Sequence, residues 1–226
     1  GRRLTSHRQC LLAERLPLLR IPLPPEAHTI DPVGLFPQRP SAIWLEVGFG
    51  NGEHLVEQAR RHPEVGFIGS EVFVNGVASL LRHIERLGLT YIRIFDDDAR
   101  LLLRCLPAAS IARMFLLFPD PWPKARHAKR RFVGPANLPV LAHLLADGAE
   151  LRIATDDPGY VRWTLRQLYD RPEFSWLAKR SRDWREPPDD WVETRYQRKA
   201  VAAGRQPVFL RFERRSRRPI PENPCE

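Results

Sequence analysis

Apolar and polar positions alternate along the chain in blocks that predict strands and helices in turn. Short continuous apolar runs predict buried strands, whereas apolar positions three and four residues apart predict the buried face of a helix. The expected strands are 43–47, 66–72, 91–95, 111–118 and 149–154, followed by 174–178 and 208–213. The expected helices are 53–62, 75–87, 99–106, 136–146 and 159–169, with a Trp-rich loop and a short helix between the last two strands.

Repeated strand–helix alternation predicts an α/β fold. Parallel strands joined by right-handed crossovers form a mostly parallel sheet with helices on both faces. The strand at 111–118 is the most apolar, so we expect it near the centre of the sheet. We predict one domain over 41–226, because a chain of 226 residues with 43% hydrophobic positions is sufficient for a single core.

The first forty residues have a different composition. Three arginines, Arg2, Arg3 and Arg8, are followed by six prolines between positions 22 and 40. Proline fixes φ and lacks a backbone donor, which opposes regular structure, although 9–16 is compatible with a short helix. We interpret 1–40 as a basic, proline-rich arm that packs on the domain or reaches out from it.

The overall charge favours a polyanionic partner. Lys and Arg total 36 against 27 Asp and Glu, which gives a net charge of +9. Each phosphate that a basic side chain neutralises releases condensed counterions, so such a surplus suits nucleic acid. An Arg-rich genome explains the same numbers, since only four of the basic residues are lysines. The chain begins at Gly1 rather than Met, which is consistent with a fragment that lacks a longer basic arm.

Several classes of protein are disfavoured. Cys10, Cys105 and Cys225 lie far apart, which predicts neither a disulfide framework nor a zinc site and fits a reducing cytoplasm. No His-Glu-x-x-His motif or clustered ligand set is present, so we predict no metal. We expect no membrane partner, because the sequence has neither a long apolar run nor a signal peptide. Monomer and homodimer both remain open.

Glycines follow the first expected strand in a pattern that suits a nucleotide site. The pattern is Glu46-x-Gly48-x-Gly50-x-Gly52. Ligands of open α/β sheets bind at the carboxyl ends of the strands, where glycine allows close approach and unusual dihedrals. An ordinary tight turn would explain the glycines alone. Glu71, however, is expected to end the next strand, where a carboxylate can accept from both ribose hydroxyls.

The third strand is also expected to end in carboxylates, at 96–98, where one can accept from an adenine amino group. A dinucleotide-binding dehydrogenase would carry a third glycine at position 53, which is Glu53 here. The acidic pattern is better suited to S-adenosylmethionine, because its sulfonium and amino groups are positive and it has no pyrophosphate.

Four segments carry a family resemblance. They are Phe-Pro-Asp-Pro-Trp-Pro-Lys at 118–124, the glycine motif at 45–52, Ile-Ala-Thr-Asp at 153–156 and Thr-Arg-Tyr at 194–196. Together they closely resemble the bacterial tRNA (guanine-N7-)-methyltransferase family, over about 45–213. The first segment is very specific, whereas many methyltransferases share the glycine motif.

The resemblance implies a single Rossmann-like class I methyltransferase domain with a seven-stranded, mostly parallel sheet. It implies transfer of a methyl group from S-adenosylmethionine to N7 of a variable-loop guanosine in tRNA, with S-adenosylhomocysteine as product. Beside the cofactor, with the turn glycines Gly48 and Gly50, it implies Glu46, Glu71, Asp98 and Asp120. As contacts to RNA it implies Lys124, Asp156, Thr194, Arg195, Tyr196 and Gln197. Asp120 is implied as the catalytic residue.

Some of these residues also have a structural interpretation. Asp156 is equally suited to cap the helix that follows it. Trp122 is suited to packing as well as to base stacking, and the basic cluster at 124–131 to solvation as well as to phosphate contact. At Gln197 the family usually has glutamate, and an amide offers one carbonyl acceptor where a carboxylate offers two oxygens.

Two other functions are compatible with this pattern. One is a class I methyltransferase acting on an exocyclic amine, because Asp120-Pro121-Trp122 partly matches the motif of those enzymes. The other is a non-catalytic RNA-binding protein on the same fold, which the acidic residues at the strand ends disfavour.

Overall fold

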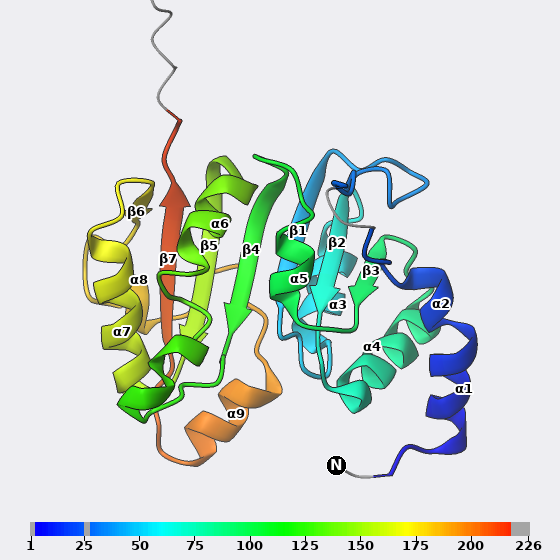
Figure 1. The fold of residues 1–226 in the computed structure, drawn as a ribbon. Helices are drawn as coiled ribbons and strands as arrows, with labels where there is room; N and C mark the ends of the chain where they lie inside the picture. The colour runs from blue at the N-terminus through cyan, green and yellow to red at the C-terminus, as the bar shows by residue number, and fades with distance from the viewer. Residues whose placement is uncertain (1–2, 25–27, 218–226) are drawn as a thin grey trace, which may run out of the picture.

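Seven strands form one sheet in the order β3-β2-β1-β4-β5-β7-β6 (Figure 1). The computed structural model describes residues 3–24 and 28–217, so Arg2, Cys225 and the end of the predicted domain lie outside it. The strands are β1 (Ala42–Val47), β2 (Val65–Ser70), β3 (Ile92–Phe95), β4 (Ile111–Leu117), β5 (Leu145–Thr155), β6 (Phe174–Trp176) and β7 (Val208–Arg214).

The first five strands are parallel, and β7 pairs antiparallel with both β5 and β6. This confirms the predicted seven-stranded, mostly parallel sheet. The strand order reverses at β1, because β2 lies on one side of it and β4 on the other. In such a sheet a crevice forms outside the carboxyl ends of the strands at the point of reversal.

Helices cover both faces of the sheet (Figure 1). The longer ones are α1 (Ser6–Glu14), α3 (Glu53–Arg61), α4 (Val74–Leu87), α6 (Leu138–Leu144), α7 (Pro158–Tyr169) and α9 (Arg195–Ala202). Shorter ones are α2 (Leu16–Leu19), α5 (Ala99–Leu103), the 3₁₀ helix η1 (Ala125–Arg130) and α8 (Arg182–Arg185). No helix of the described ranges combines the length and the apolarity that a membrane span needs.

Alternate side chains of β1 enter two separate cores. Ile43 and Leu45 pack with apolar side chains of α5, α6 and α7, whereas Trp44 packs with those of α1, α3 and α4. The period of two along a strand produces this division, because successive side chains point to opposite faces. The sheet is therefore a shared wall between two buried layers.

Element boundaries differ from the predicted ones where tertiary contacts decide them. The strand predicted to reach position 72 ends at Ser70, which leaves Glu71 beyond it. The helix predicted over 136–146 ends at Leu144, because Leu145 already pairs with Ile111 in the sheet. The segment predicted as a loop at 119–131 contains η1.

The described part of the N-terminal arm packs on the domain. Helix α1 lies against α4, and the Ile21 amide donates to the carbonyl oxygen of Ile94 at 2.8 Å. The Arg20 guanidinium makes two hydrogen bonds to Asp96, at 2.8 and 2.6 Å. The arm thus covers the outer edge of β3. Its Arg20 also binds both oxygens of Asp96, the first of the three predicted carboxylates.

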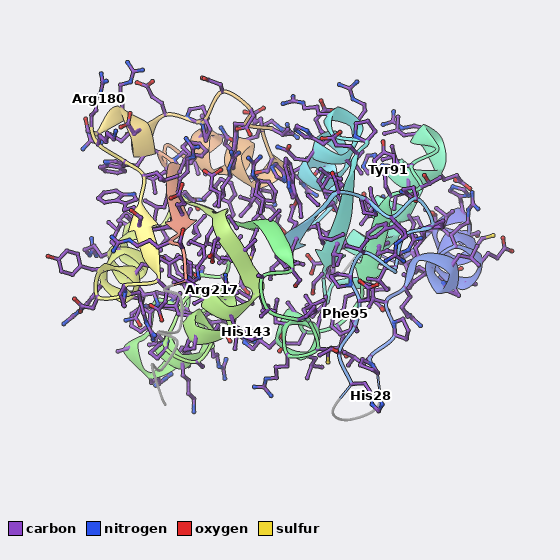
Figure 2. The ribbon with its side chains drawn as sticks, turned by 90° about the horizontal axis from the view of Figure 1, so that it is seen from above. His28, Tyr91, Phe95, His143, Arg180 and Arg217 are labelled. Carbon is purple, nitrogen blue, oxygen red and sulfur yellow. The ribbon has the colours of Figure 1, made fainter. Side chains whose placement is uncertain are left out.

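The far end of the described chain is also held. Figure 2 shows Arg217 beside His143, and Arg217 donates to the carbonyl oxygen of His143 at 2.7 Å. Arg217 also bonds the carbonyl of Leu145 at 2.9 Å. These bonds place the end of β7 against the junction between α6 and β5.

Buried charges join the central strands to the loop before α9. Arg152 of β5 contacts Glu150 at 2.8 Å and Asp190 at 2.7 Å, and Arg113 of β4 contacts Asp190 at 3.4 Å. Burial raises the pKa of Glu150 and of Asp190. Hydrogen bonds and charges of neighbouring arginines, Arg152 and Arg211 at Glu150 and Arg152 and Arg113 at Asp190, together outweigh it, so both pKa values lie below their ordinary range. Both carboxylates are therefore ionised at neutral pH.

The Asp190 carboxylate makes the free energy of unfolding depend on pH. Because its pKa is lower in the folded than in the unfolded state, its contribution is complete above about pH 4 and is lost as the pH falls through the folded value. We expect Asp190→Asn to lower the free energy of unfolding at pH 7, and the difference from wild type to shrink by pH 3. Urea unfolding at pH 7, 5 and 3 measures this, with Asp189→Asn, at the exposed neighbour, as the control. A constant difference at all three pH values would contradict it.

Candidate active site

A cavity of about 850 Å³ opens at the carboxyl ends of β1, β2, β3 and β4, where the strand order reverses. Five of the predicted site residues line it. They are Gly48, Glu71, Asp98, Asp120 and Tyr196. Asp97 of the predicted acidic run at 96–98 also lines it, as do Lys129 and Arg130 of the predicted basic cluster. Ser70, Val72, Phe73, Arg100 and Phe132 line it as well and were not predicted.

The glycine turn after β1 has the backbone that only glycine adopts readily. Gly48 and Gly50 have φ of +72° and +57°. A Cβ built at Gly48 would meet no atom within 4 Å, so the turn leaves open space on the cavity side. On its other side the turn is closely covered, because a Cβ at Gly76 would lie 2.2 Å from the carbonyl oxygen of Gly50. The turn is thus fixed from behind by α4 and open in front.

Glu71 ties two backbone segments together. Its Oε2 accepts from the amide of Gly50 at 2.8 Å, and its Oε1 accepts from the amide of Phe73 at 2.9 Å. Hydrogen bonds to an ionised acceptor are among the stronger ones in proteins. Glu71 therefore holds the glycine turn and the start of α4 in one arrangement beside the cavity.

The acidic run after β3 has three distinct roles. Asp96 pairs with Arg20, as described above. Asp98 is the N-cap of α5, where one oxygen accepts from the Arg100 amide and the other from the Arg100 guanidinium, both at 3.0 Å. Asp97 also lines the cavity, and its carboxylate accepts from the amide of Asp98 at 2.7 Å. Asp97 and Asp98 together make this wall acidic.

The loop that carries Asp120 is held in a strained conformation. Phe118 and Trp122, on either side of Asp120, have φ of 52° and 43°. Such φ values cost side-chain-bearing residues about 1–2 kcal/mol each, so surrounding contacts must impose them. Arg131 supplies two of these contacts, donating to the carbonyl oxygens of Pro121 at 3.0 Å and Trp122 at 3.1 Å. The exposed Asp120 side chain therefore projects from a braced loop.

The basic cluster at 124–131 is divided between packing and the surface. The Arg130 guanidinium lies 4.8 Å from the ring centre of Trp122, and His127 meets the same ring edge-on at 5.8 Å. Trp122 is therefore a packed ring that also lines the cavity. Lys124, Arg126 and Lys129 are exposed.

Helix α9 crosses the carboxyl ends of the strands and brings Tyr196 to the cavity (Figure 1). The Tyr196 ring would lie 3.0 Å from a Cβ at Gly50, so it covers the glycine turn. Burial raises the pKa of the Tyr196 phenol, and the charges of Glu71 and Asp120 raise it further. The phenol is therefore neutral at physiological pH, and it is close enough to both carboxylates to sense them.

Glu46 lies behind the cavity rather than in its lining. It is buried, and its Oε2 lies 2.7 Å from Nδ1 of His54, which is equally buried. Gln58 contacts the other ring nitrogen of His54 at 3.3 Å through its amide nitrogen, which can only donate. His54 therefore accepts at Nε2 and donates from Nδ1 to Glu46. His54 was not predicted, because nothing local in the chain marks a histidine as the partner of a carboxylate.

The remaining predicted residues are not part of the cavity lining. Asp156 pairs with Arg205 at 2.5 Å, and Asp157, not Asp156, is the N-cap of α7. Thr194 is the N-cap of α9 and accepts from the amide of Gln197 at 3.1 Å. Arg195 is exposed at the start of that helix.

Gln197 accepts a hydrogen bond from the indole of Trp191, and Lys124 is the N-cap of η1. Within 3–24 and 28–217, no group of three or more His, Cys, Asp or Glu side chains could hold a metal ion.

Relatives of known name match almost the whole chain. The family model described as "Putative methyltransferase" matches residues 40–210. A tRNA (guanine-N(7)-)-methyltransferase of Rhodospirillum rubrum is 54% identical over 219 residues, which are 96% of this chain and 86% of the relative. The chain belongs to the tRNA (guanine-N7-)-methyltransferase family. A second member, from Paramagnetospirillum magneticum, is 46% identical over 96% of this chain and 91% of its own length.

Solved structures share the fold of this family member at low sequence identity. The 16S rRNA methyltransferase KamB superposes with a TM-score of 0.57 at 16% identity, over 78% of this chain and 89% of its own. TrmN from Thermus thermophilus gives a TM-score of 0.54 at 19% identity, over 92% of this chain and 48% of its own. These likenesses confirm the Rossmann-like class I methyltransferase fold.

The close approach of α4 to the glycine turn can be tested at Gly76. Within a helix, replacing glycine by alanine usually stabilises by about 1 kcal/mol. Here the added Cβ would lie 2.2 Å from a backbone oxygen, and overpacking of that kind costs about 1–3 kcal/mol. We therefore expect Gly76→Ala to destabilise the protein in urea unfolding. Gly134→Ala is the control, because its Cβ would meet nothing closer than 3.6 Å. Greater stability of Gly76→Ala would show that α4 does not press on the turn.

Proposed function

We propose that this protein transfers a methyl group from S-adenosylmethionine to N7 of a variable-loop guanosine in tRNA. The observation that carries the proposal is the cavity at the strand-order reversal, where acidic groups from β2 and β3 face the loop bearing Asp120. The names of the relatives and the basic surface at 124–131 support tRNA as the substrate. A tRNA substrate would place the reaction in the cytoplasm.

The residues around the cavity fit S-adenosylmethionine. The open space in front of Gly48 would admit the chain that joins the amino acid to the ribose. Asp97 lines the wall where the adenine amino group would find an acceptor. Each oxygen of Glu71 accepts from one backbone amide, so it would take ribose hydroxyls on its remaining lone pairs. Val72 and Phe73 are 69% and 50% exposed at the cavity, and apolar surface of that kind suits the face of an adenine ring.

Glu46 would act at a distance in this arrangement. Its carboxylate is taken up by His54 behind the turn, so it would stabilise the strand end and contribute negative charge rather than bind ribose. Asp98 has both oxygens engaged by Arg100, so Asp97 is the better placed acceptor for adenine.

The proposed methyl transfer depends on positioning of the reactants more than on proton transfer. S-adenosylmethionine supplies a methyl group on a positive sulfur, which a lone pair can attack in line. Guanine N7 has such a lone pair in the plane of the ring and carries no proton, so no general base is needed. Asp120 would then orient the guanine or stabilise the positive charge that develops on it. Its braced loop suits this role, because a fixed carboxylate does not have to reorganise during the reaction.

The tRNA would be held chiefly through its phosphates and folded shape. Arg100, Lys129 and Arg130 line the cavity, with Lys124 and Arg126 exposed beyond it. Asp156 could accept from guanine N–H groups, but Arg205 holds one of its oxygens at 2.5 Å. The guanine would therefore use the other oxygen of Asp156 or displace Arg205.

The activity itself is tested with methyl-labelled S-adenosylmethionine and unmodified bulk tRNA. After nuclease digestion, nucleoside mass spectrometry should find the label in 7-methylguanosine. Label in another nucleoside, such as one methylated on an exocyclic amine, would support a methyltransferase activity but refute N7 of guanosine as its target. Folded protein that binds S-adenosylhomocysteine yet transfers no methyl group would favour the non-catalytic RNA-binding alternative.

Asp120→Asn separates a positioning role from a general base. Removing one preorganised charged group in an active site typically costs about 100- to 1,000-fold in rate. We expect a loss of that order in single-turnover methylation, with a wild-type rate that shows no required base titrating near neutrality. Asp189→Asn serves as the surface control. A wild-type pH–rate profile with a basic limb near neutrality that Asp120→Asn abolishes would identify Asp120 as a proton acceptor instead.

A further inference from the structure

The side chain of Gln197 is occupied by a neighbour within the protein. Nε1 of Trp191 donates to Oε1 of Gln197 at 2.6 Å, in a partly buried setting. The groups on guanine that a side-chain oxygen could recognise are its N1 and N2 hydrogens, which need an acceptor. The carbonyl oxygen of Gln197 already accepts from the indole, which leaves one lone pair for two guanine hydrogens, and its amide nitrogen can only donate.

Trp191 is a rigid donor. Its ring meets Phe209 edge-on at 4.7 Å and lies 5.8 Å from His54. The preceding residue, Asp190, is held by Arg152 through its carboxylate, and its carbonyl oxygen accepts from Gln58 at 3.2 Å. The indole N–H is therefore anchored to β5, β7 and α3 before it reaches Gln197.

Helix α9, by contrast, has few other contacts at its first turn in the part of the chain that the structure describes, chiefly the buried cap Thr194 and the Tyr196 ring against Gly50. Of its eight residues only Ala200 is buried, and only Thr194 caps its start. Short helices with little buried surface are marginal on their own and open easily. The bond from Trp191 is thus a main tie between the start of α9 and the body of the protein.

Tyr196 immediately precedes Gln197 and is the residue of α9 that reaches the cavity. Its ring lies over Gly50, and the charges of Glu71 and Asp120 raise the pKa of its phenol. It is 50% exposed, so nothing encloses it on the outer side. The position of its ring consequently depends on where the first turn of α9 is held.

We propose that Gln197 is a positioning residue for Tyr196 and does not recognise guanine. Through its hydrogen bond to Trp191, it fixes the start of α9 and keeps the Tyr196 ring over the glycine turn, at the mouth of the cavity. This rests on the proposed function in one respect, that the cavity binds S-adenosylmethionine.

The test is a set of variants read first by binding of S-adenosylhomocysteine without RNA. Trp191→Phe removes the donor and keeps an aromatic ring, and Gln197→Met removes the acceptor at similar volume. We expect each to weaken binding about three- to tenfold, the loss typical of one hydrogen bond, and the double variant to be no worse than either. Gln197→Glu, which restores an acceptor, should bind within about twofold of wild type.

Two comparisons tie the effect to Tyr196. Tyr196→Ala should weaken binding similarly, and adding Gln197→Met to it should cause no further loss. Arg198→Met, at the next position of α9, is the matched control and should bind as wild type does, because the exposed Arg198–Glu193 pair contributes little. In the NMR spectrum, the indole N–H signal that Trp191→Phe removes should shift in Gln197→Met and return towards its place in Gln197→Glu.

The outcomes separate this inference from the proposed function. Additive losses in the double variant, or an unmoved indole signal in Gln197→Met, would overturn the positioning role. So would a Gln197→Met variant that binds normally and loses only the methylation of tRNA while Trp191→Phe stays fully active, because Gln197 would then act on the guanine. Failure of wild-type protein to bind S-adenosylhomocysteine, or to methylate tRNA, would instead refute the proposed function.

Discussion

The reversal of strand order at β1 is the constraint on which the rest of the site depends. Strands β2 and β4 lie on opposite sides of β1. The connections that follow the carboxyl ends of the strands therefore diverge and leave a crevice between them. The turns after β1 and β2 and the loop after β4 all end at this crevice. A residue placed directly after any of these strands therefore reaches the same cavity, however far apart the residues are in sequence. The acidic walls and the Asp120 loop are brought together in this way.

A chain of hydrogen-bonded polar groups connects the sheet to the loop before α9. Glu46 bonds His54, His54 bonds Gln58, and Gln58 bonds the carbonyl oxygen of Asp190. Asp190 in turn pairs with Arg152 of the central sheet. A buried carboxylate without such partners would be strongly destabilising, so each pair fixes its neighbour as well as itself. The loop before α9, which sequence patterns describe only as Trp-rich, is thereby bonded to α3 and to the central sheet.

Local patterns were sufficient for the fold and for part of the site. Periods of two and of three to four residues are properties of single elements, so strands and helices could be placed to within a few residues. The glycine turn and Glu71 could be predicted because the chemistry of a strand end depends on residues close in sequence. The pairing of Arg20 with Asp96 and of Trp191 with Gln197 could not, since nothing local in either segment specifies the other. The engagement of Asp98 by Arg100 is by contrast local, because an aspartate directly before a helix is suited to cap it, although the prediction placed Asp98 beside the cofactor.

The two sides of the cavity differ in how they are stabilised, and the difference follows from their tasks. On the β4 side, Phe118 and Trp122 are strained, and Arg131 holds their loop with bonds to backbone oxygens. Strain of that kind persists only when several contacts impose it, so Asp120 stands on a surface that cannot easily relax. On the α9 side, Tyr196 depends on few ties and remains half exposed. In the proposed reaction, a rigid wall suits a carboxylate that meets developing charge in one geometry. A lightly held wall suits a surface past which a cofactor and a large RNA must both enter and leave.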